Sequence, residues 1–203
     1  MIQLQNVSKK FSKKILFDNF NLNIDDGEFI VFHGNSGCGK TTLLNMLGGL
    51  EKPDNGSIII DEIDITNEKN LRHYYTYKVG FLFQNFALLE NKTVKQNLNL
   101  IQKKARNNIS IENVLSSVGL LDKIDTKVYK LSGGEQQRVA LARLMLKKCD
   151  IILADEPTGS LDSRNADIVM DILHKLNENG KTIILVTHNE NYIKTAERVV
   201  ELK

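Results

Sequence analysis

The segment Gly34-Asn35-Ser36-Gly37-Cys38-Gly39-Lys40-Thr41-Thr42 stands between a short apolar run at 28–33 and helix-forming residues at 41–47. This order of strand, glycine-rich loop and helix is the context that a phosphate-binding loop requires. The glycines let consecutive backbone N–H groups point at phosphates, and the following helix adds the positive end of its dipole. Lys40 is expected to place its charge between the terminal phosphates, and the Thr41 hydroxyl to coordinate Mg²⁺. The segment therefore predicts a nucleotide-binding α/β fold.

A second apolar run, at 151–154, ends in two carboxylates, Asp155 and Glu156. They should emerge at the C-terminal edge of a strand, where parallel sheets bind their ligands. Because adjacent strand residues point to opposite sides, the two carboxylates can take different roles. We expect Asp155 to bind Mg²⁺ and Glu156 to polarise the attacking water.

A second glycine-containing loop precedes a helix at Leu131-Ser132-Gly133-Gly134-Glu135. The residues at 135–143 form a strong helix pattern, so the loop creates an anion-binding helix end by the same physics as the first. An ordinary helix N-cap would explain Ser132 but not the whole run. The chain is thus predicted to present two separate phosphate-binding surfaces.

These three motifs, in this order, resemble the ATP-binding subunit of an ABC transporter, and the resemblance covers essentially the whole chain. It implies an ATPase that uses ATP and Mg²⁺ and works as a dimer with a second copy of itself. In that family the loop Ser132, Gly133 and Gly134 completes the ATP site of the other copy. The residue that matches Glu156 is the catalytic base.

The resemblance assigns four further residues. Gln84 matches the Q-loop glutamine, which reaches Mg²⁺ and the attacking water. His188 matches the switch histidine, which contacts the γ-phosphate and should reach the same sheet edge as the carboxylates. Asp162 lies in the loop that crosses the dimer interface. Phe11 matches the aromatic residue that stacks on adenine. Two other phenylalanines are nearby, and any of the three could instead be a core residue.

The predicted fold class is α/β, a P-loop NTPase core with a parallel sheet, an antiparallel β layer and a helical ABC subdomain. Residues 1–203 are predicted to form a single ABC ATP-binding domain, with a core at 1–85 and 147–203 and a mostly helical subdomain at about 86–146. The antiparallel layer is expected from strand patterns at 3–7, 15–24 and 57–65. Apolar strands at 151–154 and 182–186, joined by an amphipathic stretch at 166–176, are expected to be parallel.

Composition restricts the partners. A formal net charge of +2 gives no reason to expect nucleic acid. The lysines at 9, 10, 13 and 14 are interpreted as a solvated face. No apolar run approaches the roughly 18 residues of a membrane span, and the N-terminus lacks a signal pattern. The chain is therefore expected in the cytoplasm, peripheral on the inner face of the membrane through a permease. Cys38, in the phosphate loop, is either an exposed reactive thiol or turned away and inert.

The leading function is an ATPase that dimerises and powers a separate integral membrane permease. Residues 86–94 follow Gln84, at the place where transporter subunits build a groove for a permease helix. Alternatively, the apolar residues of this run simply fill the core of the helical subdomain. The alternative is a soluble ABC-type ATPase acting on DNA or ribosomes, but the chain lacks a repair-type coiled coil and a second cassette. Small nucleotide kinases have no use for the run at 131–135. Within the transporters, the run at 153–162 resembles the branch of MacB, LolD and FtsE. The short chain and the run at 84–91 resemble bacteriocin exporters, which implies export of a peptide or bacteriocin, or mechanotransmission.

Overall fold

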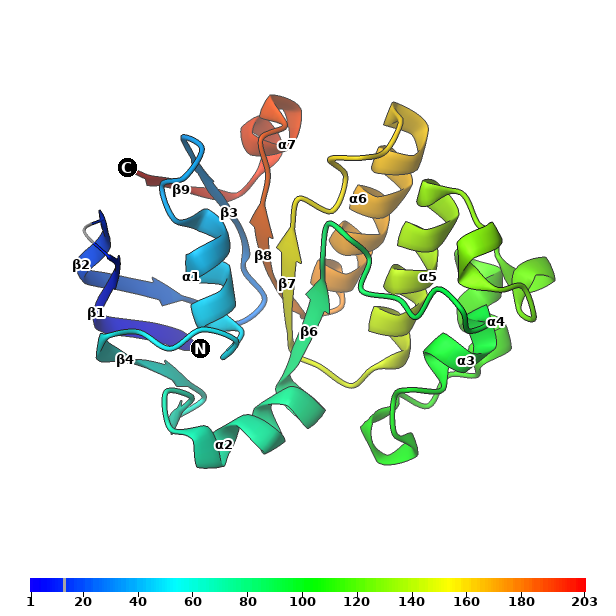
Figure 1. Ribbon diagram of the computed structural model, residues 1–203, viewed down its shortest axis with the longest axis horizontal. Coiled ribbons are helices and arrows are strands. Elements are labelled where there is room, and N and C mark those ends of the chain that lie inside the picture. Colours follow the sequence, from blue (N-terminus) through cyan, green and yellow to red (C-terminus); the bar gives the residue numbers. More distant parts are fainter. Residues whose placement is uncertain (13) are drawn as a thin grey trace.

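The computed structural model describes residues 1–12 and 14–203. It is built in layers (Figure 1): an antiparallel sheet, helix α1 (Lys40–Leu47), a parallel sheet, and then helices on the far face of that sheet. The predicted α/β class, with one parallel and one antiparallel sheet, is confirmed. Within the described residues, no helix is long and apolar enough to cross a membrane.

The parallel sheet has the strand order β6-β7-β8-β3-β9. Its strands are β3 (Phe29–Gly34), β6 (Val79–Leu82), β7 (Ile151–Asp155), β8 (Thr182–Val186) and β9 (Arg198–Leu202). Helices cover both faces, which explains why the central strands are continuous apolar runs. The expected parallel pairing of β7 with β8 is confirmed, whereas β6 and β9 were not predicted.

The antiparallel sheet has the order β2-β1-β4-β5. Its strands are β1 (Ile2–Phe11), β2 (Lys14–Ile24), β4 (Asn55–Ile60) and β5 (Ile63–Asp64). Ile2, Leu4 and Val7 of β1 are buried against the core, which continues through α1 to the parallel sheet. Leu43 and Leu47 of α1 are fully buried in this core, so the helix that follows the first loop is held between the two sheets.

Helices α5 (Gly133–Leu146) and α6 (Ser163–Glu178) cover the other face of the parallel sheet (Figure 1). One side of α5, including Leu141 and Leu144, packs in the core beneath the sheet. Its opposite side, including Val139 and Leu146, packs against α3 (Val94–Leu98) and α4 (Ile111–Ser117) in a separate apolar cluster. Helix α5 is therefore buried on two sides and joins the sheet to the outer helices.

The prediction that 86–146 is mostly helical holds only in part. Its α-helices are α3, α4 and α5, and much of the rest is turns, with short 3₁₀ turns at Lys103–Ala105, Leu121–Lys123 and Val128–Lys130. Side-chain caps from Thr93, Ser110 and Ser132 start the three helices at fixed points. The remaining helices are α2 (Glu68–His73), which continues into a π-helical turn at Tyr74–Lys78, and α7 (Glu190–Thr195).

Candidate active site

The glycine-rich loop leaves β3 in a backbone conformation that favours glycine. Gly34, Gly37 and Gly39 have φ values of 150°, 78° and 104°. A Cβ on Gly34 would lie 2.2 Å from the carbonyl oxygen of Leu202, so no larger residue fits there without a backbone shift. The loop thus turns tightly onto the N-terminus of α1, where free backbone N–H groups can bind anions.

Lys40, the first residue of α1, is only 6% exposed. Its Nζ donates hydrogen bonds to the carbonyl oxygens of Gly34 at 2.8 Å and Asn35 at 2.9 Å, which holds the ammonium inside the curve of the loop. The hydroxyl of Thr41, next along the helix, lies 3.3 Å from Oδ1 of Asp155. The loop and the end of β7 therefore meet at one point.

A cavity of about 570 Å³ opens at this point. The residues predicted from sequence that line it are Ser36, Gly37, Gly39, Lys40, Thr41, Thr42, Gln84, Asp155, Glu156 and His188. They come from the C-terminal end of β7, from the loops that follow β3, β6, β7 and β8, and from the start of α1. Four strand ends of one parallel sheet thus deliver a cation, a hydroxyl, an amide, two carboxylates and an imidazole to a single space.

The two carboxylates reach this cavity together, which differs from the expectation that they point to opposite sides. Asp155 ends β7 in an extended conformation, but Glu156 has a left-handed φ of 45°. Its backbone N–H donates to Val186 of the neighbouring strand end at 2.9 Å. This turn rotates the Glu156 side chain, so both carboxylates line the same cavity.

Glu156 and His188 face each other. Oε1 of Glu156 lies 3.3 Å from Nε2 of His188, and the His188 backbone N–H donates to Oε2 at 3.4 Å. The Glu156 side chain is 17% exposed. Burial raises the pKa of Glu156 above its usual range, and the nearby His188 opposes this effect. Burial likewise raises the pKa of Asp155, opposed by the hydrogen bond from Thr41 and the charge of Lys40.

The residues present fit a hydrated Mg²⁺ bound together with phosphates. The oxygen atoms of Thr41 and Asp155 are hard donors, and such an ion takes one or two protein ligands and keeps substrate oxygens and water. Among residues 1–12 and 14–203 there is no cluster of three or more His, Cys, Asp or Glu side chains that could hold a metal without a substrate.

The second predicted phosphate-binding surface lies apart from this cavity. Ser132 and Gly133 are exposed at the start of α5, and neither they nor Gly134 line the cavity. Ser132 and Glu135 form a capping box, in which each side chain bonds to the backbone of the other. A Cβ on Gly134 would lie 2.7 Å from Cγ of Asn165, so this glycine allows α6 to approach closely.

Two other predicted residues also lie outside the lining. Phe11, at the end of β1, is 48% exposed, and Nζ of Lys9 lies 5.1 Å from its ring centroid. Its ring is therefore available for stacking on one face. Asp162 caps α6 by accepting from the backbone N–H of Asn165 at 2.9 Å, and this bond helps to lower the pKa of Asp162.

The interpretation of the N-terminal lysines as a solvated face was wrong for Lys9, whereas Lys10 and Lys14 are exposed as expected. Lys14 donates from Nζ to the carbonyl oxygen of Gly37 at 2.7 Å and so contacts the phosphate loop. Lys9 is 7% exposed and pairs with Glu51 at 2.5 Å. Lys13 lies outside the described residues. A run of lysines beside a predicted strand end carries no signal that separates such contacts from exposed positions.

Of the two alternatives for Cys38, an exposed thiol or one turned away from solvent, the structure has the second. It is 9% exposed, and its Sγ lies 3.8 Å from Nζ of Lys40 inside the loop. Gly34 and Asn35 likewise shape the loop from within, through their carbonyl contacts with Lys40.

Comparison with known proteins defines the class to which this site belongs. The family described as ABC transporter matches residues 17–159. The chain is 40% identical over 210 residues to the macrolide export ATP-binding/permease protein MacB of Campylobacter jejuni, covering 100% of this chain but 33% of MacB. It is 39% identical over 210 residues to the lipoprotein-releasing system ATP-binding protein LolD of Aquifex aeolicus, covering 94% of LolD.

A solved dimeric structure of the ATP-binding cassette MJ0796 in a post-hydrolysis state, bound to ADP and Pi, superposes with a TM-score of 0.86 at 38% identity. The match covers 100% of this chain and 94% of that one. The chain therefore belongs to the ABC transporter family and is an ABC-type ATPase. It spans about a third of the length of its MacB relatives, at 33% of the Campylobacter jejuni protein.

Proposed function

We propose that this chain closes face to face with a second copy of itself around Mg-ATP and that hydrolysis powers a partner membrane permease. The observation that carries the proposal is the separation of the two predicted phosphate-binding surfaces. The loop at Lys40 lies in the cavity, whereas the loop at Ser132 is exposed and outside it. A second copy related by two-fold symmetry can place its own Ser132 loop over the open cavity.

Residues of the cavity, and two residues outside its lining, have roles in this proposal. The loop N–H groups and Lys40 hold the phosphates, and Thr41, Asp155 and Gln84 hold Mg²⁺, which neutralises phosphate charge when bound. Glu156 accepts a proton from the attacking water, and His188 both orients Glu156 and contacts the terminal phosphate. Phe11 stacks on the adenine ring, and Asp162 positions the loop at the dimer interface.

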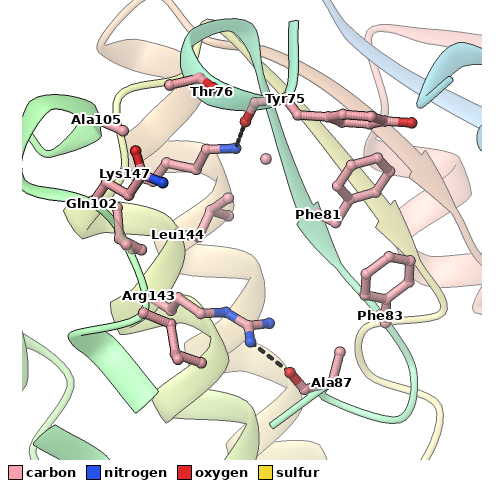
Figure 2. Close-up of a pocket in the computed structure, with 13 residues that line it drawn as sticks. Tyr75, Thr76, Phe81, Phe83, Ala87, Gln102, Ala105, Arg143, Leu144 and Lys147 are labelled. Carbon is pink, nitrogen blue, oxygen red and sulfur yellow. Dashed lines mark hydrogen bonds between the residues drawn. The ribbon is translucent and has the colours of Figure 1, made fainter. Parts of the chain in front are cut away.

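A groove beside the sheet supports a permease as the partner. A second cavity, of about 410 Å³, lies between β6 and α5 and is shown in Figure 2. Its apolar lining includes Phe81 and Phe83 on one side and Leu144 of α5 on the other. Its lining includes Phe83 and Ala87, which lie on either side of Gln84 in the sequence, so a bound segment would contact the stretch of chain that carries a residue of the ATP cavity. We infer that a short cytoplasmic helix of the permease binds here, which would keep the chain on the inner face of the membrane.

The relatives guide the inference about cargo. MacB is described as a macrolide export protein and LolD as part of a lipoprotein-releasing system. We propose that this chain likewise drives export of a peptide or bacteriocin, or moves a partner by mechanotransmission. Nothing in the comparisons favours the alternative, a soluble ATPase acting on DNA or ribosomes.

The shared-site proposal is tested by mixing two inactive variants. Lys40→Ala removes a phosphate contact within the cavity, and Ser132→Arg blocks the surface offered to the other copy. Each variant alone should lack turnover, but a mixed dimer has one intact site. An equimolar mixture should recover about a quarter of wild-type activity, because half of the dimers are mixed and each has one of two sites.

The mixture carries two different affinity tags, so mixed dimers can be purified and their ATPase rate measured directly. Purified mixed dimers without turnover, or a Ser132→Arg variant that hydrolyses ATP normally, would contradict the shared site. A membrane protein that co-purifies with the wild type and is lost on mutation of Phe81 to Asp, but not of an exposed residue elsewhere, would support the permease.

A further inference from the structure

Two cations face the groove from one side of α5 and its C-terminal cap. Arg143 and Lys147 are four residues apart, so they lie on the same face of the helix, one turn from each other. Figure 2 shows both side chains extending from α5 toward the opposite wall of the groove. Phe81 and Phe83 stand on that wall, with stacked rings whose centroids are 5.1 Å apart.

Neither cation has a carboxylate partner among the residues that the structure describes. Arg143 donates to the carbonyl oxygens of Ala87 at 2.5 Å and Phe86 at 3.0 Å. Lys147 donates to the carbonyl oxygen of Tyr75 at 2.6 Å and also to that of Val79. These bonds occupy two N–H donors of each cation, but a neutral carbonyl leaves the charge uncompensated.

Burial makes both charges unfavourable. Burial lowers the pKa of Arg143 and of Lys147; for Lys147 the nearby Cys149 opposes this effect, and the charge of Arg143 adds to it. A partly buried like-charge pair with no counter-ion is rare in folded proteins, because desolvation and repulsion act in the same direction. An anion that entered the groove would relieve both effects.

The surroundings of the groove are also basic. None of its lining residues is Asp or Glu. Lys103, Lys104 and Lys148 are exposed and are neighbours in sequence of the lining residues Gln102, Ala105 and Lys147. The electrostatic potential of the opening therefore favours a negatively charged segment and would orient it on approach.

We propose that the segment that binds in this groove is an amphipathic helix with an apolar face that presents a carboxylate to Arg143 and Lys147. The proposal rests on the proposed function for the existence of a docking partner, and it adds the chemistry by which that partner is recognised. A helix fits better than a lipid headgroup because the cations lie inside an aromatic-walled cavity. A headgroup would meet the exposed rim lysines first.

The test uses a displayed library of helical peptides of about 16 residues, roughly four turns, with one randomised position between apolar anchors. The library is selected on the full chain and, in parallel, on Lys147→Met. The matched control is Lys148→Met, which removes a neighbouring exposed cation outside the lining. Circular dichroism and ATP binding check that each variant is folded.

We expect the wild type and Lys148→Met to select Asp or Glu at the randomised position. Changing that residue to Gln or Asn in the best peptide should weaken binding to the wild type about tenfold. On Lys147→Met the acidic preference should fall below threefold. If Lys147→Met does not fold, the affinities of the Glu and Gln peptides for the wild type, compared at low and high salt, test the proposal on their own.

Three results would overturn the proposal: no acidic preference on the wild type, no peptide bound at all, or equal preference on Lys147→Met. Binding to vesicles of phosphatidylglycerol that depends on Lys147, without peptide binding, would assign the groove to the membrane surface instead. The mixed-dimer experiment is independent of these outcomes. Active mixed dimers with no acidic preference would refute only this inference, whereas inactive mixed dimers would refute the proposed function.

Discussion

Glu156→Gln should increase the stability of the chain while it abolishes turnover. Oε1 of Glu156 is buried without an aligned hydrogen bond, although Nε2 of His188 lies 3.3 Å away. Oε2 accepts only a long bond of 3.4 Å. A buried group so poorly satisfied costs on the order of 1–3 kcal/mol, and glutamine removes its charge while keeping its size. Because the new amide keeps part of this cost, we expect a gain of about 1 kcal/mol, or about 2–4 °C in Tm for a chain of this size.

The stability gain should depend on pH in one direction. Burial raises the pKa of Glu156 in the folded state, so the protonated form is the one that the fold favours. The stabilising contribution of that proton is fully present below the unfolded-state pKa, and it is lost as the pH rises through the folded-state pKa. The difference between wild type and Glu156→Gln should therefore be largest at neutral pH and shrink in acid.

Thermal unfolding without nucleotide, at neutral and acid pH, measures this difference. Glu178→Gln, an exposed carboxylate at the end of α6, is the matched control and should show no comparable change. Steady-state ATPase rates measure the second effect: loss of a general base lowers turnover by about 10²–10⁴-fold, and the variant should accumulate as an ATP-bound dimer. An unchanged or lower Tm at neutral pH would refute the burial argument, and near-normal turnover would refute the assignment of the base.

Three further experiments test the site. Phe11→Ala should weaken ATP binding by about 2–10-fold if the ring stacks on adenine, whereas Phe11→Tyr should not, and equal affinities by titration calorimetry would exclude stacking. Because Cys38 is buried, it should react slowly with maleimide in the free chain, and more slowly still when Mg-ATP is bound. Mass spectrometry measures the labelling, and rapid, equal labelling in both states would contradict this expectation. Gly134→Ala should lower the Tm because the new Cβ displaces Asn165, although alanine favours a helix by about 1 kcal/mol over glycine. Adding Asn165→Gly should restore the Tm. An unchanged Tm in Gly134→Ala alone would show that no displacement occurs.

Local signals predicted the centre of the fold correctly. The apolar run, glycine loop and helix at β3 and α1 follow from adjacent residues, and β7 and β8 are apolar runs buried on both faces. The position of Asp155 at a strand end followed from the same pattern. These elements are specified by short stretches of sequence, so their prediction needed no knowledge of distant contacts.

Other elements depend on contacts that no short stretch specifies. Strand β6 has only four residues and includes Gly80, whose missing side chain leaves room for Leu144 of α5. Strand β9 is partly exposed and lies at the edge of the parallel sheet, next to β3. The left-handed conformation of Glu156 was missed because glutamate rarely adopts it; the surrounding structure, including its bond to Val186, holds it in place.

Helix α5 connects the second predicted phosphate-binding surface to the groove. Ser132 caps its start, and Gln137, fully buried near the middle of the helix, donates to the carbonyl oxygen of Pro157 at 2.7 Å, just after Glu156. Near its end, Arg143 holds the turn that follows Gln84. A helix of this length, about 21 Å, transmits a tilt at one end to the other because its packed sides leave little room to bend. Closure of a second copy on Ser132 and binding of a carboxylate at Arg143 would therefore act on the same rigid element, which gives a physical route between ATP and the partner.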